Sequence, residues 1–150
     1  MECQAALHHG REQMNPLSLE DDGCCFACGM DNPDGLKIAW TVDGDIMTGE
    51  FVPEPKFQGW KGIVHGGILA TLLDEAMTRL AAISCGGAVT AEMTVRYVRP
   101  ARIGEKLFIR GELVRRLRKL AEMKASLADA EGSLIAHATG KAIISSSKLF

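Results

Sequence analysis

This chain of 150 residues has little excess of either charge and no long apolar run. The formal net charge is only -2, which argues against a nucleic-acid-binding protein, because such proteins carry a strongly basic surface. No apolar run approaches the roughly 18 residues of a membrane span, and the first residues lack the basic and then apolar pattern of a signal peptide. We therefore expect a cytoplasmic protein with neither nucleic acid nor a membrane as its partner.

The five cysteines do not predict a disulfide framework, because their number is odd and two of them are adjacent. Cys25 and Cys28 have the spacing of a metal knuckle or a redox pair, but a structural zinc usually takes a second pair of ligands. The other nearby candidates, Cys24, His8 and His9, are poorly spaced. The residues after Cys28 are typical of a loop. We expect two thiols in a turn, no bound metal and no organic cofactor.

The remaining composition is that of an ordinary globular domain, with 47% hydrophobic, 24% charged and 5% aromatic residues. A chain of this length can bury a sizeable core within one domain. Residues 1–24 are polar and irregular, so we expect a flexible arm there, followed by a single domain over residues 25–150.

The central feature of the sequence is an apolar pattern at helical spacing, which predicts a largely buried helix over residues 66–84. The apolar positions are Leu69, Leu72, Leu73, Ala76, Met77 and Leu80. Asp74 lies inside this pattern, and a buried aspartate is costly unless it is paired, hydrogen-bonded or used in chemistry. An ion pair with Arg79 or Arg96 is the structural alternative to a chemical role.

The start of this helix is suited to polarising a bound carbonyl group. Backbone N–H groups of a first helical turn lack intrahelical partners and carry partial positive charge. Gly66 and Gly67 allow a ligand to approach that backbone closely. A polarising helix end and a carboxylate base, Asp74, are the parts needed to hydrolyse an acyl compound.

Strand patterns surround the helix on both sides in the sequence. Residues 36–42 and 46–52 predict a hairpin with its turn at Asp43-Gly44-Asp45. Four further strands are predicted after the helix, and their short connections imply antiparallel neighbours. They cover residues 88–98, 106–116, 120–129 and 134–145. A lone apolar helix beside these strands is buried best when the sheet curls around it, which predicts an α+β layer fold.

Three segments together resemble the hotdog-fold acyl-CoA thioesterases, in the branch of the phenylacetyl-CoA and hydroxybenzoyl-CoA types. His65-Gly66-Gly67, with Asp74 nine positions after the histidine, matches the active-site helix of that family. Residues 90–101 look like its central strand, which ends at a proline.

The third segment, Gly104-Glu105, is similar to the turn that follows this strand, and residues 25–36 are similar to an N-terminal signature of one subgroup. The resemblance covers about residues 25–146. It implies a curved antiparallel sheet of five or six strands around one long helix, in a homodimer and in a tetramer of two dimers.

The resemblance also implies roles for individual residues. The backbone N–H of Gly66 or Gly67 would polarise the thioester carbonyl, and Asp74 would act as general base on water or as a nucleophile, in a site completed by the partner subunit. His65 would position the carbonyl or orient the leaving thiolate. Thr90, on the central strand, would hold the water or the carboxylate.

Two positions depart from a simple match. Many relatives carry Asn or Gln six residues before the histidine, where this chain has Gly59, and Gln58 lies one residue earlier. A shift of one residue in the loop would let Gln58 contact the substrate. Glu75 competes with Asp74 as the base, but helix neighbours point about 100° apart, so only one can face the site while the other meets a cation or an interface.

The expected substrate is an acyl-CoA thioester. Arg99 and Arg102 flank the proline of the central strand and are the best candidates to bind the phosphates of coenzyme A. The acyl group, and the choice between coenzyme A and an acyl carrier protein, are not set by the sequence. A hydratase is disfavoured, because in that class the acid precedes the histidine. The main alternative is a non-catalytic module that binds acyl-CoA or lipid.

Overall fold

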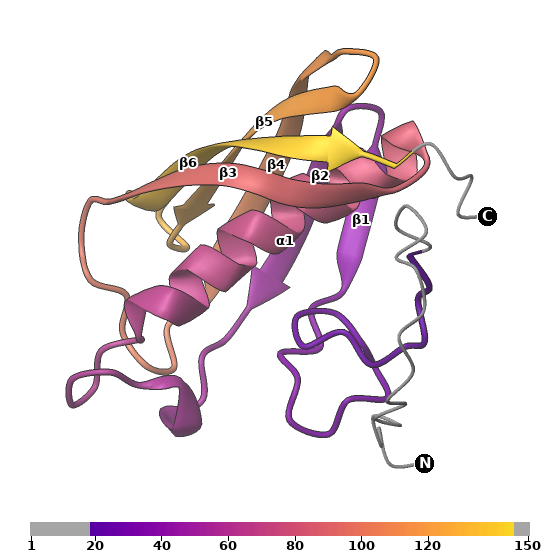
Figure 1. Cartoon of the computed structure of the whole chain (residues 1–150). Helices are drawn as coiled ribbons and strands as arrows, with labels where there is room; N and C mark the ends of the chain where they lie inside the picture. Colours follow the sequence, from indigo (N-terminus) through magenta and orange to yellow (C-terminus); the bar gives the residue numbers. More distant parts are fainter. Residues whose placement is uncertain (1–18, 146–150) are drawn as a thin grey trace.

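A computed structural model describes residues 19–145 of the chain, which fold as six strands and one long helix (Figure 1). Most of the predicted arm, residues 1–24, lies outside the described residues, as do residues 146–150. A 3-10 turn precedes the helix. The elements in order are β1 (Trp40–Asp43), β2 (Ile46–Phe51), η1 (Pro55–Phe57), α1 (Gly66–Cys85), β3 (Ala88–Tyr97), β4 (Leu107–Arg116), β5 (Leu120–Ala128) and β6 (Leu134–Ile144).

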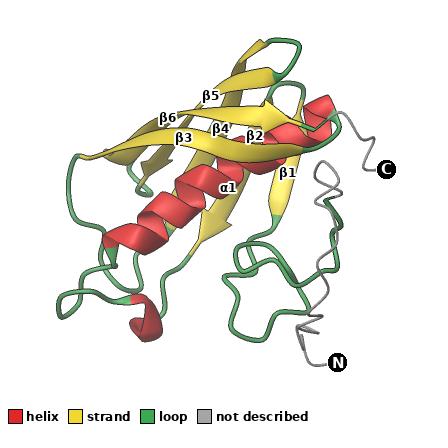
Figure 2. Ribbon diagram, in the orientation of Figure 1, coloured by secondary structure: helices red, strands yellow, loops and turns green. Residues whose placement is uncertain are grey.

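The strands form one antiparallel sheet in the order β1-β2-β4-β5-β6-β3. Figure 2 shows α1 lying diagonally across one face of this sheet, which bends around it. In this order β1 and β3 are the two edge strands. Although β3 directly follows the helix in the sequence, it pairs with β6, the last strand of the chain. The helix thus lies beside an edge strand, and that neighbourhood positions the candidate site.

The buried face of α1 is the one that the apolar spacing predicts. All six predicted apolar positions are buried in the core, together with Ala81. The helix begins at His65, whose ring caps it, and ends at Gly86, which has a φ of 84°. A left-handed residue at this point is the usual way to end a helix, and glycine adopts it without a steric penalty.

Close contact between helix and sheet depends on a glycine in β4. A Cβ atom at Gly111 would lie 2.3 Å from the carbonyl oxygen of Ala76 in α1, so no larger residue fits unless the helix moves. The backbones approach here more closely than two side chains would allow, and this sets the depth at which α1 lies in the sheet.

One predicted strand is wrong at its start. The structure has β1 from Trp40, not from Leu36, because the backbone of residues 36–39 is used elsewhere. The Leu36 N–H donates to the carbonyl of Phe26, and the Ile38 N–H donates to that of Ala27. Lys37 between them has a φ of 53°, which is incompatible with a strand. The other predicted ends of helix and strands agree with the structure within one residue.

No helix within residues 19–145 is long and apolar enough to cross a membrane.

Candidate active site

Two threonine hydroxyl groups surround the carboxylate of Asp74. Thr90 in β3 donates to Asp74 Oδ1 at 2.6 Å, and Thr78, one turn further along α1, donates to the same oxygen at 3.2 Å. The two hydroxyl oxygens are themselves 2.6 Å apart. Both bonds end on Oδ1, so the second carboxylate oxygen has no hydrogen-bond donor among residues 19–145. That oxygen is available to accept a proton.

Asp74 is half-buried, not deeply buried as its place in the apolar pattern suggested. The reason is that it faces β3 at the edge of the sheet and not the closed core. Within the described chain, no cation lies within 4.0 Å of its carboxylate, so neither Arg79 nor Arg96 forms the structural ion pair considered above. The charge of Asp74 is held by neutral hydroxyl groups, which keeps the carboxylate free for another partner.

Thr90 owes its position to an irregularity in β3. Thr90 pairs with Ala142 and Glu92 pairs with Lys141, so one extra residue on β3 lies between two adjacent residues of β6. Such a bulge changes the direction of the neighbouring side chains. It lies directly beside the residue whose hydroxyl reaches the helix.

The start of α1 has one N–H group that is occupied and one that is free. His65 Nδ1 accepts from the N–H of Gly67 at 2.9 Å, so this donor is used by the cap. Among residues 19–145, the N–H of Gly66 has no acceptor. Of the two candidate donors for a substrate carbonyl, Gly66 is therefore the open one. Since Nδ1 is an acceptor, a neutral His65 ring carries its proton on Nε2.

Tyr97 anchors this end of the helix to the end of β3. Its hydroxyl donates to the carbonyl oxygen of Gly66 at 2.9 Å. The bond fixes the peptide unit beside the free N–H and joins the two elements that carry the candidate site.

The free N–H and the carboxylate are too far apart to act on one carbonyl group within one chain. Gly66 and Asp74 are eight residues apart on a continuous helix, a separation of about 12 Å along the axis. A water molecule between a base and a thioester carbonyl spans about half of that, given ordinary hydrogen-bond lengths.

An open hollow of about 430 Å³ adjoins the start of α1. Its lining comes from the loop before the helix and from the first helical residue. The lining residues are Gly59, Trp60, Ile63, Val64, His65 and Gly66. The Trp60 side chain is 86% exposed, so a large apolar surface stands at the rim without a covering partner in the described chain.

Gln58 lies in the same loop, but its side chain is engaged. Gln58 Oε1 accepts from the N–H of Gly62 at 3.2 Å, which closes the loop on itself. In this conformation the side chain stabilises the loop and does not line the hollow.

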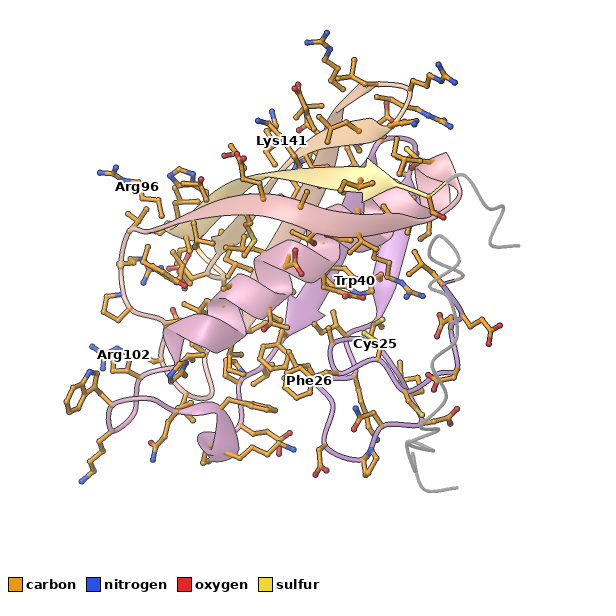
Figure 3. All side chains as sticks on the ribbon, in the orientation of Figure 1. Cys25, Phe26, Trp40, Arg96, Arg102 and Lys141 are labelled. Atoms are coloured by element: carbon orange, nitrogen blue, oxygen red, sulfur yellow. The ribbon has the colours of Figure 1, made fainter. Side chains whose placement is uncertain are left out.

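The two arginines proposed for phosphate binding differ in their surroundings. Arg99 pairs with Asp129 and lies 4.0 Å from Glu105, so its charge is already neutralised. Arg102 is exposed, and its side chain forms no ion pair within residues 19–145. It lies at the end of the molecule where α1 begins (Figure 3), held there by a bridge between Ile63 and its own backbone.

Glu75 faces away from the carboxylate pocket of Asp74, as helix geometry predicts for a neighbour. Its side chain lies 4.0 Å from the guanidinium of Arg79 and about equally far from the sulfur of Cys25. The expectation that the second acid meets a cation is confirmed.

Two residues of the site were not anticipated from the sequence. Thr78 follows Asp74 by four positions, and residues at this spacing lie on one helix face, so the pattern contained a signal for it. Tyr97 offered no comparable signal, because its bond to Gly66 depends on the path of β3.

A family model described as thioesterase superfamily matches residues 61–136, just over half of the chain. The chain belongs to this superfamily. The matched region contains the helix start, both threonines and Asp74.

Individual members of the thioesterase superfamily match in part. Acyl-coenzyme A thioesterase THEM4 of Xenopus laevis is 41% identical over 54 residues, which are 36% of this chain and 24% of that protein. Acyl-coenzyme A thioesterase 13 of Mus musculus is 35% identical over 78 residues, 50% of this chain and 56% of that protein. The chain thus spans little more than half, or less, of the curated relatives it matches.

A solved structure of the superfamily superposes over most of the chain. Zebra fish thioesterase superfamily member 2 aligns with a TM-score of 0.69 at 25% identity, covering 78% of this chain and 91% of that one. The hotdog fold expected from the sequence is confirmed by this match and by the single helix against a six-stranded antiparallel sheet.

Proposed function

We propose that the protein hydrolyses an acyl-CoA thioester to the free acid and coenzyme A. The observation that carries this proposal is the carboxylate of Asp74, which accepts from two hydroxyl groups on one oxygen and, among residues 19–145, has no cation beside it and no donor on its other oxygen. A carboxylate held in this way can accept a proton from water. The superfamily membership and the names of the relatives, both acyl-coenzyme A thioesterases, support the thioester as substrate.

In the proposed reaction, Asp74 removes a proton from a water molecule as the water oxygen attacks the thioester carbon. The carbonyl oxygen becomes negative, and the free N–H of Gly66 donates to it at the positive end of the helix. The carbon–sulfur bond then breaks. The sulfur leaves as the thiolate of coenzyme A, near the Nε2 proton of His65, and the acid departs with the new oxygen.

The site requires two copies of the chain. Because Gly66 and Asp74 of one chain are about 12 Å apart along the helix, we propose that the donor comes from one subunit and the base from the other. The edge strand β3 has free backbone groups and lies beside α1, so pairing of two such edges would bring two helices together. Homodimers that assemble into a tetramer remain our expectation, as does a cytoplasmic location.

Coenzyme A would enter beside the start of the helix. The hollow lined by Trp60 and His65 leads to the Gly66 N–H, and Arg102 at the same end supplies an unpaired cation for a phosphate group. Arg99 contributes through its ion pairs to the structure of this region.

The first experiment measures release of free thiol from short, long and aryl acyl-CoA esters by the native protein and by Asp74→Asn. Loss of a general base should lower turnover by about 10²–10⁴-fold. Asp43→Asn, at the exposed end of β1, is the matched control and should keep full turnover. Binding of acyl-CoA without turnover on any ester would instead establish the non-catalytic module.

A further inference from the structure

A compact loop holds two cysteine sulfurs beside Glu75 and Arg79 of α1, on a different face of the helix from the Asp74 pocket. The loop precedes β1 and is indigo in Figure 1; Figure 3 shows Cys25 between this loop and the helix. The N–H of Gly29 donates to the carbonyl of Cys25 at 2.8 Å and closes a tight turn around Cys25 and Cys28. Both thiols are free.

The turn is specific to glycine at one position. A Cβ atom at Gly29 would lie 2.3 Å from the carbonyl oxygen of Gly23 and 2.4 Å from the backbone nitrogen of Cys25. Ala27, between the two cysteines, is buried at 3% exposure. The loop is therefore anchored to the core between the two cysteines.

Glu75 brings a carboxylate from the helix to the two thiols, fifty residues after Cys25 in the sequence. Its carboxylate oxygens lie 3.9 and 4.0 Å from the sulfur of Cys25. The ligand atoms of Cys25, Cys28 and Glu75 all lie within 4.8 Å of one another. Around a tetrahedral zinc, sulfur and oxygen ligands are about 3.6 Å apart, so a small contraction of this cluster would satisfy the ion.

The charges around the cluster also suit a divalent cation. Two thiolates and the carboxylate of Glu75 carry three negative charges, which Zn²⁺ would reduce to one, and the guanidinium of Arg79, which also pairs with Asp21 at 3.8 Å, lies beside them. Arg79 Nη1 lies 3.1 Å from the sulfur of Cys28 and 4.0 Å from Glu75.

We propose that Cys25, Cys28 and Glu75 bind one zinc ion, with a water molecule in the fourth position. Thiolate ligands favour zinc over magnesium or calcium, which prefer oxygen. Each thiol releases its proton to solvent when it coordinates the metal. The ion would fasten the loop before β1 to the helix that carries Asp74. The site is independent of the proposed hydrolysis.

The test measures zinc in the full-length protein after equilibration with zinc sulfate under reducing conditions and removal of loosely bound metal. About one zinc per chain is expected for the native protein, and Glu75→Gln, Cys25→Ser and Cys28→Ser should lose it. Cys85→Ser is the matched control, because Cys85 is another free, half-buried cysteine, at the far end of α1; it should retain the ion.

A second measurement needs no variant. In the native protein, zinc should protect Cys25 and Cys28 from alkylation while leaving the alkylation of Cys85 unchanged, as read by mass spectrometry of the peptides. Absence of retained zinc, or equal retention in Glu75→Gln and the native protein, would overturn the proposal. Zinc retention that depends on His8 and His9 and not on Glu75 would do so as well.

Discussion

At the scale of single residues, the hydroxyl group of Thr90 is expected to govern the rate of hydrolysis. A hydrogen bond to a charged group contributes about 1.5–3 kcal/mol, and each 1.36 kcal/mol corresponds to about tenfold in rate. Thr90→Val, which keeps the shape but removes the hydroxyl, should lower kcat about 10–100-fold with little change in KM. Steady-state kinetics on the preferred ester measures both constants.

The control for this prediction is Thr90→Ser, which restores a hydroxyl and should recover most of the lost kcat. Thr78→Val is expected to have a smaller effect, because its bond to Asp74 is longer, 3.2 Å against 2.6 Å. Equal kcat values for Thr90→Val and the native protein would show that this hydroxyl does not position the base.

Asp129 is a second residue whose contribution can be measured, because it affects the stability of the fold at acid pH. Burial disfavours its charge, but the N–H groups of Ser133 and Glu131 and the guanidinium of Arg99 outweigh that and hold its pKa below the ordinary 3.8. A carboxylate with a lowered folded pKa stabilises the fold fully above its unfolded pKa, and this contribution is lost as the pH falls through the folded value.

Asp129→Asn should therefore flatten the decrease in Tm below about pH 4, where the native protein loses this contribution. Thermal melting as a function of pH is the measurement, and Asp43→Asn, at the exposed end of β1, should keep the native profile. Parallel melting profiles for the native protein and Asp129→Asn would contradict the prediction.

At the scale of elements, the packing of α1 on β4 through Gly111 is expected to tolerate no added atom. Gly111→Ala places a methyl group 2.3 Å from a helix carbonyl oxygen, and overpacking of this kind costs about 1–3 kcal/mol. The Tm should fall by about 2–4 °C for each kcal/mol. Thr48→Ala, an exposed change on neighbouring β2, should stay within about 0.5 kcal/mol of the native stability.

The sequence predicted the elements well where one face of an element is buried. The spacing of six apolar residues predicted α1, and the alternation of apolar and polar residues predicted most strands. Burial of one face gives each element a periodic pattern of apolar residues that can be seen in the sequence. The start of β1 could not be predicted in this way. Leu36 and Ile38 alternate with polar residues as in a strand, yet their N–H groups donate to carbonyl groups of the cysteine loop. The residues around Leu36 give no sequence signal for these bonds.

The site was predictable only as far as local geometry reaches. The helix start and Asp74 belong to one element, so helical spacing predicted their positions relative to one another. The use of Gln58 to close its own loop, and the meeting of Glu75 with Cys25, depend on how separate segments pack together. Contacts between distant segments leave no periodic pattern in the sequence, so only the structure reveals them.

At the scale of the whole molecule, the assignment of one site to two chains can be tested by mixing inactive variants. Gly66→Pro removes the proposed N–H donor at a helix position that proline favours, and Asp74→Asn removes the base. In a random one-to-one dimer mixture, half of the dimers carry one intact site of two. Refolding the variants together should restore about a quarter of native activity.

The control for this experiment is Gly66→Ala, which keeps the N–H group. A Cβ atom at Gly66 would lie 3.5 Å from the Tyr97 ring, an ordinary contact, so this variant should remain active alone. Mixtures that stay inactive would show that both groups act within one chain.

The fixed separation of Gly66 and Asp74 along the helix has a consequence for how activity depends on dimer assembly. When two identical helices lie side by side in opposite directions, Gly66 of each chain lies beside Asp74 of the other chain, because both helices have the same separation between these residues. The dimer therefore has two equivalent sites. In the native protein, the two catalytic sites of a dimer would therefore form together and be lost together, and a monomer would have no complete site. Specific activity should consequently fall on dilution along the dissociation curve of the dimer, and acyl-CoA bound across both chains should hold that curve at lower protein concentration.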